Sequence, residues 1–194
     1  YGEMFARYAN EYDAVVQITI GANFSCCYQN ACAAAQEYEN VFVVDSENLS
    51  TGQGLLVVAA AKLAEQGLSG AEIAERVRAL APKVEASFLI ECLDYMRKGG
   101  RCSAVAALGA NLLHLKPCIE VRNGKMAVCK KYRGSFEKCI RQYVKERLDG
   151  REDIAPELAF ITHAAADANV VAAAKEEAAQ YGSFETVEET QAGC

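Results

Sequence analysis

The chain has 194 residues, 52% of them hydrophobic and 24% charged, which is the ordinary composition of a globular protein. A chain of this length can bury about 70% of its unfolded surface, enough for one large domain or two small ones. The formal net charge of −6 argues against a general nucleic-acid-binding protein, because contacts with phosphates need an excess of Lys and Arg.

The first part of the chain carries alternating helix and strand signals. Residues 1–13 have aromatic side chains at helical spacing, and residues 14–20 have the apolar character of a strand. Ser25 can cap a helix over residues 26–38, and the short apolar run 41–44 is typical of a strand buried on both faces. Strand, helix and strand in this order predict a βαβ unit with two parallel strands.

The next stretch is predicted to contain a loop and two helices. Residues 45–54 are polar and contain glycines, so we expect a loop there, followed by a nearly all-apolar helix over residues 55–64. Ser69 and Glu72 have the spacing of a capping box, in which each side chain accepts a hydrogen bond from the other residue's backbone N–H. This box predicts the start of the second helix, which has apolar residues at every third or fourth position.

The second part of the chain contains a strong hairpin signal. Asn123-Gly124 is typical of a type I′ turn, since both residue types tolerate positive φ, and it separates predicted strands at residues 118–122 and 125–130. The other predicted elements are a strand at residues 88–90, helices ending at Lys98 and spanning 103–113, a helix from Phe136 to Gly150, a strand at 158–162, a helix at 167–181 and a strand at 186–188.

One turn has the setting of an anion site. Residues 21–25 connect a predicted strand to a helix, and ligands bind at the carboxyl ends of strands in open α/β sheets. Free backbone N–H groups and the positive end of the helix favour a carboxylate or a phosphate there. The alternative is a plain strand-to-helix turn with Ser25 as its cap.

A second candidate is a basic segment. Arg97, Lys98 and Arg101 flank two glycines, and together these cations could hold a phosphate or an acidic partner. The alternative is a helix end whose cations offset the helix dipole. A third basic group, at residues 130–133, is expected to be a solvated edge of the hairpin.

The nine cysteines are odd in number and have no C-x2-C spacing. We therefore expect reduced thiols that act as small hydrophobic side chains, no metal, no cofactor and a cytoplasmic protein. The charged and non-basic start of the chain predicts that no signal peptide is present. No apolar run approaches the roughly 18 residues of a membrane span.

The sequence gives little support to catalysis. Cys26 or Cys27, at the start of a helix, could act as a nucleophile, yet no partner base is evident for either. The spacing of His114 and His163 does not predict a Ser/His/acid triad, and P-loop and G-x-G-x-x-G motifs are absent from the sequence. We therefore predict a binding protein rather than an enzyme. A thiol-dependent or phosphotransferase-like enzyme is the alternative.

Five segments, taken in order, resemble motifs of the DegV family, the bacterial fatty-acid-binding proteins. Residues 20–31 resemble the signature I-S-S-x-L-S-G-T-Y-x-S-A, and residues 45–54 resemble D-S-x-x-x-S-x-G-x-G. Residues 93–103 resemble L-x-Y-L-x-x-G-G-R-I-S, while residues 115–117 and 132–134 resemble I-K-P and V-R-G. Each motif alone is weak, and their order and spacing make the resemblance specific.

The resemblance implies a two-domain α/β fold with a fatty acid between the domains. A parallel βαβ first domain, incomplete here, would span residues 1–84. A second α/β domain with a β-hairpin, lacking its C-terminal segment, would span residues 85–194. The carboxylate of a long-chain fatty acid would be held by residues of the turn described above, namely Gly21, Ala22, Asn23 and Ser25.

The resemblance also implies a partner. Several members of the family present the carboxylate to a separate fatty acid kinase, and Arg101 matches the arginine implicated in docking the kinase or the phosphate. Transient contact with a membrane surface is compatible with this role. No nucleic acid, metal or cofactor is expected.

The chain departs from the family pattern in the turn that is expected to hold the carboxylate. Gly21 and Ala22 replace paired serines, and Cys26-Cys27 replace Gly-Thr. The family also has a D-S-x-x-D strand and a T-S-Q-P loop before the position of Tyr1, and an H-x-G-P segment with a head-group histidine beyond the position of Cys194. A DegV-like interaction protein that has lost lipid binding is therefore a further alternative.

Overall fold

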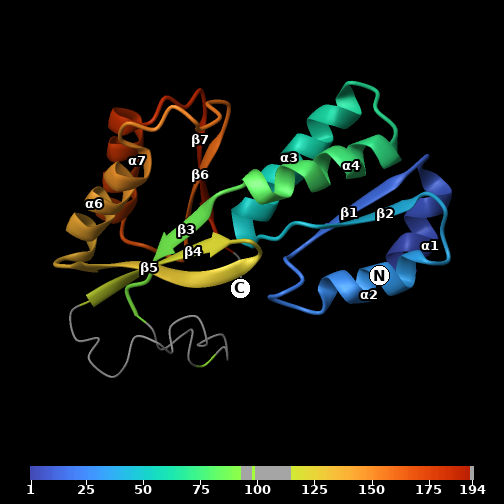
Figure 1. Ribbon diagram of the computed structural model, residues 1–194, viewed down its shortest axis with the longest axis horizontal. Coiled ribbons are helices and arrows are strands. Elements are labelled where there is room, and N and C mark those ends of the chain that lie inside the picture. The colour runs from blue at the N-terminus through green and yellow to red at the C-terminus, as the bar shows by residue number, and fades with distance from the viewer. Residues whose placement is uncertain (93–97, 99–114, 193–194) are drawn as a thin grey trace. The chain divides into compact units, whose positions relative to one another are not determined.

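The structure is a computed structural model that describes residues 1–92, 98 and 115–192 (Figure 1). Its fold is mixed α/β, as the sequence predicts. The chain divides into two compact units. The first comprises Tyr1–Ala86 and Val121–Met126, and the second comprises Ser87–Glu120 and Ala127–Cys194. In the described residues, every helix is too short or too polar to span a bilayer.

The first unit is built on a pair of parallel strands. β1 (Val15–Thr19) and β2 (Val41–Asp45) pair along their whole length, so that Thr19 lies opposite Asp45 at the carboxyl edge. The helix α2 (Cys27–Ala35) connects them. The predicted βαβ unit is therefore confirmed.

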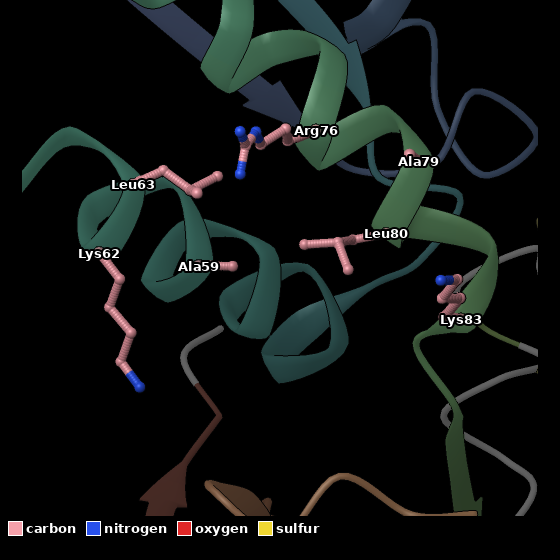
Figure 2. A pocket seen from close by; sticks show the side chains of 7 residues that line it. All are labelled: Ala59, Lys62, Leu63, Arg76, Ala79, Leu80 and Lys83. Atoms are coloured by element: carbon pink, nitrogen blue, oxygen red, sulfur yellow. The ribbon is translucent and has the colours of Figure 1, made fainter. Parts of the chain in front are cut away.

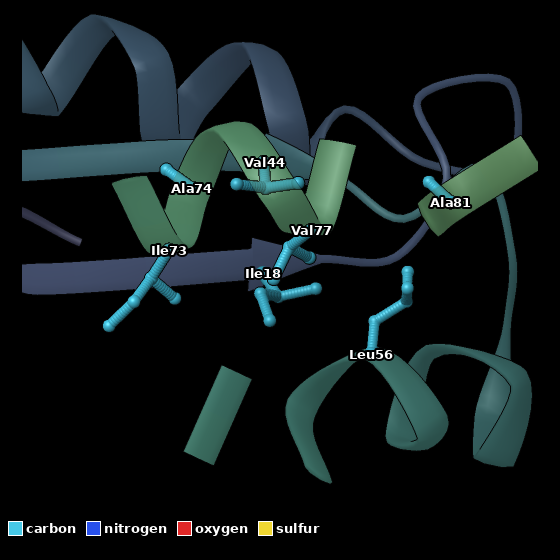
Figure 3. Close-up of a cluster of buried hydrophobic side chains, with 7 residues drawn as sticks. All are labelled: Ile18, Val44, Leu56, Ile73, Ala74, Val77 and Ala81. Carbon is cyan, nitrogen blue, oxygen red and sulfur yellow. The ribbon is translucent and has the colours of Figure 1, made fainter. Parts of the chain in front are cut away.

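Apolar side chains cover both faces of this strand pair, because successive residues of a strand point to opposite faces. The helices α3 (Ser50–Glu65) and α4 (Gly70–Leu80) cover one face, and α1 (Gly2–Glu11) and α2 cover the other. The first face buries Ile18, Val44, Leu56, Ile73, Ala74, Val77 and Ala81 (Figure 3), and the second buries Phe5, Ala31, Val41 and Val43. The first unit is thus a three-layer α/β/α arrangement.

The helix α3 begins earlier than the sequence predicts. Residues 50–54 form its first turns, so the expectation of a loop over residues 45–54 is wrong for this part. The glycines suggested a loop, but Gly52 is buried and serves close packing instead. A Cβ atom on Gly52 would overlap the side-chain oxygen of Asn48, so the glycine allows the helix to pack closely against that side chain.

The capping box at the start of α4 is confirmed. The Ser69 hydroxyl accepts a hydrogen bond from the Glu72 N–H at 3.4 Å, and the Glu72 carboxylate accepts one from the Ser69 N–H at 2.9 Å. These two hydrogen bonds satisfy N–H groups that a helix start otherwise leaves unpaired. A short 3-10 helix, η1 (Ala81–Lys83), follows α4 directly.

Most residues of a three-stranded sheet in the order β3, β4, β5 belong to the second unit, and its hairpin turn belongs to the first. Its strands are β3 (Ala86–Leu89), β4 (Leu115–Arg122) and β5 (Lys125–Arg133). Asn123 and Gly124 have φ angles of 52° and 67°, as a type I′ turn requires, so the predicted hairpin is confirmed. Two strands joined by a two-residue turn run antiparallel.

A second βαβ unit completes this part of the chain. β6 (Ala159–His163) and β7 (Val187–Gln191) are parallel and are connected by α7 (Ala168–Tyr181). The helix α6 (Phe136–Leu148) packs against α7, and Arg141 of α6 contacts Glu176 and Glu177 of α7 at 2.8 and 3.2 Å. The predicted helix over residues 103–113 lies outside the described residues.

Candidate functional site

The predicted head-group residues all lie in the loop that follows β1. Gly21, Ala22, Asn23 and Ser25 occupy this loop, and the loop after β2 lies beside it because the two strands are parallel and in register. Carboxyl ends of parallel strands are where open α/β sheets bind ligands. We call the loop of residues 20–26 the head-group loop.

The carboxylate of Asp45 joins the two loops. Its Oδ1 accepts hydrogen bonds from the backbone N–H groups of Ala22 and Glu47 at 3.1 and 2.9 Å, and its Oδ2 lies 3.3 Å from the Ala22 nitrogen. The N–H of Gly21 donates to the carbonyl oxygen of Asn48 at 2.8 Å. Groups of the neighbouring loop therefore already accept the hydrogen bonds of the Gly21 and Ala22 N–H groups.

Buried polar side chains fix the loop after β2. The Ser46 hydroxyl donates to the Asn48 carbonyl at 3.0 Å and accepts from the Asn48 N–H at 3.1 Å, and the Asn48 amide donates to the Val84 carbonyl at 3.1 Å. Ser46 is fully buried and Asn48 is 1% exposed. Fully satisfied buried networks of this kind hold one conformation, since each lost hydrogen bond would leave a buried group without a partner.

Two residues of this loop adopt a backbone conformation that side chains disfavour. Glu47 and Ser50 have φ angles of 50° and 48°, in the left-handed region. Such residues persist only where surrounding contacts determine them, and they concentrate at functional sites. The buried Asn48 between them supplies those contacts, so the strain coincides with the candidate site.

The place of the first lost serine is filled by an aromatic ring. A Cβ atom on Gly21 would lie 2.9 Å from Cδ2 of Phe24 and 3.1 Å from the backbone nitrogen of Asn48. The Phe24 N–H donates to the Gly21 carbonyl at 2.8 Å, which closes a tight turn. The Phe24 ring therefore packs in the space that a side chain at position 21 would occupy.

The loop retains donors for an anion. The backbone N–H groups of Asn23, Ser25 and Cys26 have no hydrogen-bond partner among the residues that the structure describes. They lie at the start of α2, where the helix dipole is positive. The arrangement can therefore hold a carboxylate, although with fewer donors than a loop with paired serines.

Ser25 does not occupy the cap position that the sequence predicts. The residue at the cap of α2 is Cys26, one residue later. The Ser25 hydroxyl nevertheless accepts a hydrogen bond from the Cys27 N–H at 3.3 Å, the short-range contact that serine makes in turns. The sequence pattern therefore placed the start of the helix one residue too early.

Hydrogen bonds reach the sulfur of Cys27, the second of the two adjacent cysteines. The Ser25 hydroxyl lies 3.1 Å from its sulfur, and hydrogen bonds from Ser25 and then Tyr1 lower the pKa of the Cys27 thiol. Neither contact is a base at neutral pH. Within the described ranges, no cluster of three or more His, Cys, Asp or Glu residues could hold a metal.

A groove elsewhere in the first unit does not include the head-group loop. It has a volume of about 380 Å³ and lies between α3 and α4, where Leu80 points toward Ala59 (Figure 2). Its lining consists of apolar residues with cations around them: Ala59, Leu63, Ala79 and Leu80, and Lys62, Arg76 and Lys83. The predicted site residues are therefore brought together at the strand ends and not at this groove.

Sequence reasoning missed the parts played by Asp45, Asn48 and Gly124. A Cβ atom on Gly124, in the hairpin turn that belongs to the first unit, would lie 3.1 Å from the Asn23 side-chain nitrogen. The sequence signals at these residues were the end of a buried strand at Asp45, the motif over residues 45–54 and the Asn123-Gly124 turn, and none of them specified the contacts. Arg101, the predicted docking residue, lies outside the described residues.

A family model described as "Uncharacterised protein, DegV family" matches residues 1–194. A DegV domain-containing protein of Clostridium acetobutylicum is 38% identical over 137 residues, which cover 70% of this chain and 49% of that protein. Protein DegV of Bacillus subtilis is 30% identical over 190 residues, covering 95% and 67% of the two chains. The chain spans about half the length of several curated relatives.

Solved structures agree with these matches. A fatty-acid-binding DegV family protein from Thermus thermophilus has a TM-score of 0.82 at 26% identity, covering 98% of this chain and 68% of its own. A fatty-acid-binding DegV family protein from Streptococcus agalactiae has a TM-score of 0.80 at 26% identity, covering 99% and 68%. The likeness thus extends over both units of this chain.

Proposed function

The chain belongs to the DegV family, and from that premise we propose that it is part of a protein that binds a long-chain fatty acid. The observation that carries the proposal is its likeness, along almost its whole length, to fatty-acid-binding structures of the family. Affinity would come chiefly from burying the acyl chain, at about 0.8 kcal/mol per CH₂ group. The head-group loop would orient the carboxylate and contribute less.

Lipid extraction tests the proposal directly. The protein is expressed in bacteria, purified, denatured and extracted, and the extract is analysed by mass spectrometry. A fatty acid should be recovered in near-stoichiometric amount, and stripped protein should bind added palmitate or oleate. A lipid-free extract together with no binding of either fatty acid would reject the proposal.

The assignment of the head group to the loop needs its own variants. Ser25→Ala and Asn23→Ala remove polar side chains from the loop and should weaken fatty acid binding. Ser69→Ala is the matched control, because it removes a serine that caps α4 and lies outside the loop. It should lower stability by about 1 kcal/mol and leave binding unchanged. Equal effects of Ser25→Ala and Ser69→Ala on binding would place the head group elsewhere.

Presentation of the bound carboxylate to a fatty acid kinase is the finer part of the proposal. Its support is the resemblance of the segment around Arg101 to the family motif. Arg101→Ala should leave the amount of bound fatty acid and the melting temperature nearly unchanged, while slowing phosphorylation by an added fatty acid kinase. A variant that loses lipid or melts much earlier would show that Arg101 is structural or faces the head group.

One observation favours a second candidate function, a DegV-like interaction protein without lipid. The paired serines are absent, and Asp45 already accepts the Ala22 hydrogen bond. The extraction experiment separates this candidate from the first. The enzyme alternative, which rests on Cys26 or Cys27, would require a turnover that the double variant Cys26→Gly, Cys27→Thr abolishes.

A further inference from the structure

Two cysteines face each other across the β4–β5 hairpin. Cys118 lies four residues before Arg122 and Cys129 four residues after Lys125, so a two-residue turn places them directly opposite. The Cys129 thiol lies 3.5 Å from the Cys118 carbonyl oxygen. Opposite residues of an antiparallel pair have Cα atoms about 4.5–5.5 Å apart, within the roughly 4.4–6.8 Å that a disulfide spans.

One guanidinium group contacts both sulfur atoms. Nη2 of Arg147, on α6, lies 3.1 Å from Sγ of Cys129 and 3.9 Å from Sγ of Cys118. The same nitrogen forms an ion pair with Glu120 at 3.2 Å, which holds the arginine over the pair. A cation at this distance stabilises a thiolate, the form of cysteine that attacks oxidants and disulfides.

The two thiols differ in their access to solvent. Cys129 is exposed, whereas Cys118 is 1% exposed. Burial, together with the hydrogen bond to Cys129, raises the pKa of the Cys118 thiol to about 12. Cys118 therefore stays protonated and shielded in the reduced protein, while Cys129 is reachable from solvent.

We propose that Cys118 and Cys129 form an oxidant-sensitive dithiol site, in which a peroxide oxidises Cys129 and Cys118 then closes a disulfide across the hairpin. In the first step, the Cys129 sulfur attacks one peroxide oxygen. The S–O bond forms, the O–O bond breaks, and the leaving hydroxide takes up the thiol proton as water. The product is a sulfenic acid.

In the second step, the Cys118 sulfur attacks the Cys129 sulfur. The S–S bond forms, the S–O bond breaks, and the hydroxyl leaves with the Cys118 proton as a second water molecule. The sulfur pair loses two electrons and the peroxide gains them. A thiol donor reverses the reaction by exchange through a mixed disulfide.

Among the residues that the structure describes, the exposed Cys26 lacks this combination. Cys26 is exposed, and the contact described for its sulfur is with the side-chain amide of Asn30 at 3.6 Å. It therefore serves as an internal reference for unassisted oxidation in the same sample. Exposure alone would oxidise Cys26 and Cys129 at similar rates.

Peptide mapping after mild oxidation tests the proposal. The 194-residue chain is treated with equimolar hydrogen peroxide, alkylated and digested with trypsin without reductant. Cleavage after Arg122 and Lys125 separates the two cysteines unless they are bonded. A linked peptide, lighter by two hydrogen atoms and released by dithiothreitol, is expected before Cys26 reacts. Oxidised Cys129 without that link, or oxidation of Cys26 at the same rate, would overturn the proposal.

Variants separate the roles of the three residues. Cys118→Ala should stop at a sulfenic acid on Cys129 that dimedone traps, and Cys129→Ala should leave Cys118 reduced. Arg147→Met should slow disulfide formation severalfold, and Arg147→Lys less so. Glu120→Gln is the matched control, because it removes the ion pair and keeps the guanidinium. Equal rates in folded Arg147→Met and wild type, or oxidation of Cys118 in Cys129→Ala, would contradict the assignment.

Discussion

The two parallel strand pairs of the molecule share a topology and differ in their surroundings. The pair β1–β2 is covered on both faces, and its carboxyl edge is held by the buried residues Thr19, Ser46 and Asn48. The pair β6–β7 has no residue as buried as these. Near its carboxyl edge, Glu189 forms ion pairs with the half-buried His163 and with the exposed Lys175.

The difference shows that topology alone does not locate a site. Both edges are carboxyl ends of parallel strands, and the loop after β6 also contains a left-handed residue, Ala165, yet among the described residues the buried polar side chains lie at the first edge. Buried networks are costly to disturb, whereas exposed ion pairs contribute little. Substitutions at the first edge should therefore have large effects on stability, and substitutions at the second should have small ones.

The largest effect is expected for Gly52→Ala. The new Cβ would overlap the Asn48 side chain and lie 3.2 Å from the Ala86 Cβ, so the buried amide must move and lose its hydrogen bonds. Overpacking and a lost buried hydrogen bond together should lower the free energy of unfolding by about 3 kcal/mol, despite the better helix propensity of alanine. Urea unfolding followed by circular dichroism measures the change.

Gly54→Ala is the matched control in the same helix. The nearest atom to its new Cβ is the Thr51 Cβ at 3.9 Å, an ordinary contact. This variant should gain up to about 1 kcal/mol, because alanine is the better helix former. If both variants shift stability in the same direction, the packing of Gly52 against Asn48 is not what fixes this edge.

The second prediction concerns the serine that the family has at position 21. Gly21→Ser alone should cost about 1–3 kcal/mol, because the Phe24 ring and the Asn48 backbone occupy the space. Adding Phe24→Leu, the residue of the family signature, should recover most of that loss. A double-mutant cycle measures the coupling between the two positions. Additive effects would show that the ring and the glycine are independent.

The order of elements was predictable because its signals are local. The capping box at Ser69 and Glu72 and the Asn123-Gly124 turn each need only a few neighbouring residues. The βαβ pattern is a series of three such local elements, and all three predictions are confirmed. The family motifs are also short segments of the sequence, and one of them predicted the head-group loop. Local pattern also explains the error at residues 50–54, where glycines were interpreted as loop formers.

The contacts that organise the site were not predictable in this way. Asp45 accepts from Ala22, which is 23 residues away, and Asn48 donates to Val84, which is 36 residues away. No pattern along the chain specifies such pairs, because they depend on how helices and strands pack. The sequence therefore indicated which loop to examine, and only the structure revealed which of its donors are already occupied.

The third prediction tests where the head group lies. Asp45→Asn keeps an acceptor for the Ala22 N–H but removes the negative charge, so stability should fall by about 1 kcal/mol. Binding of a fatty acid should strengthen, because the carboxylate no longer meets a like charge in the loop. Calorimetric titration with palmitate measures the affinity. Weaker binding in a folded Asp45→Asn protein would place the head group away from this edge.

The smallest effect is expected at the other edge, for Glu189→Gln. Hydrogen bonds from Lys175 and then His163 lower the pKa of the Glu189 carboxyl. The unfolded chain therefore binds a proton at this carboxyl more readily than the folded chain does. The stabilisation from these hydrogen bonds is present above the pKa of an unfolded glutamate. It disappears as the pH falls through the lower pKa of the folded state. The variant should melt slightly earlier than wild type at neutral pH, and the difference should vanish on acidification.

Thermal melts of Glu189→Gln and wild type from neutral pH to about pH 3 measure this convergence. Because the pair is exposed and screened by salt, the neutral-pH difference should also shrink as salt is added, whereas the effect of Gly52→Ala should not. If Glu189→Gln lost as much stability as Gly52→Ala, and salt did not change that loss, the second edge would be held as rigidly as the first. The contrast between buried hydrogen bonds and exposed ion pairs would then fail to separate the candidate site from its topological counterpart.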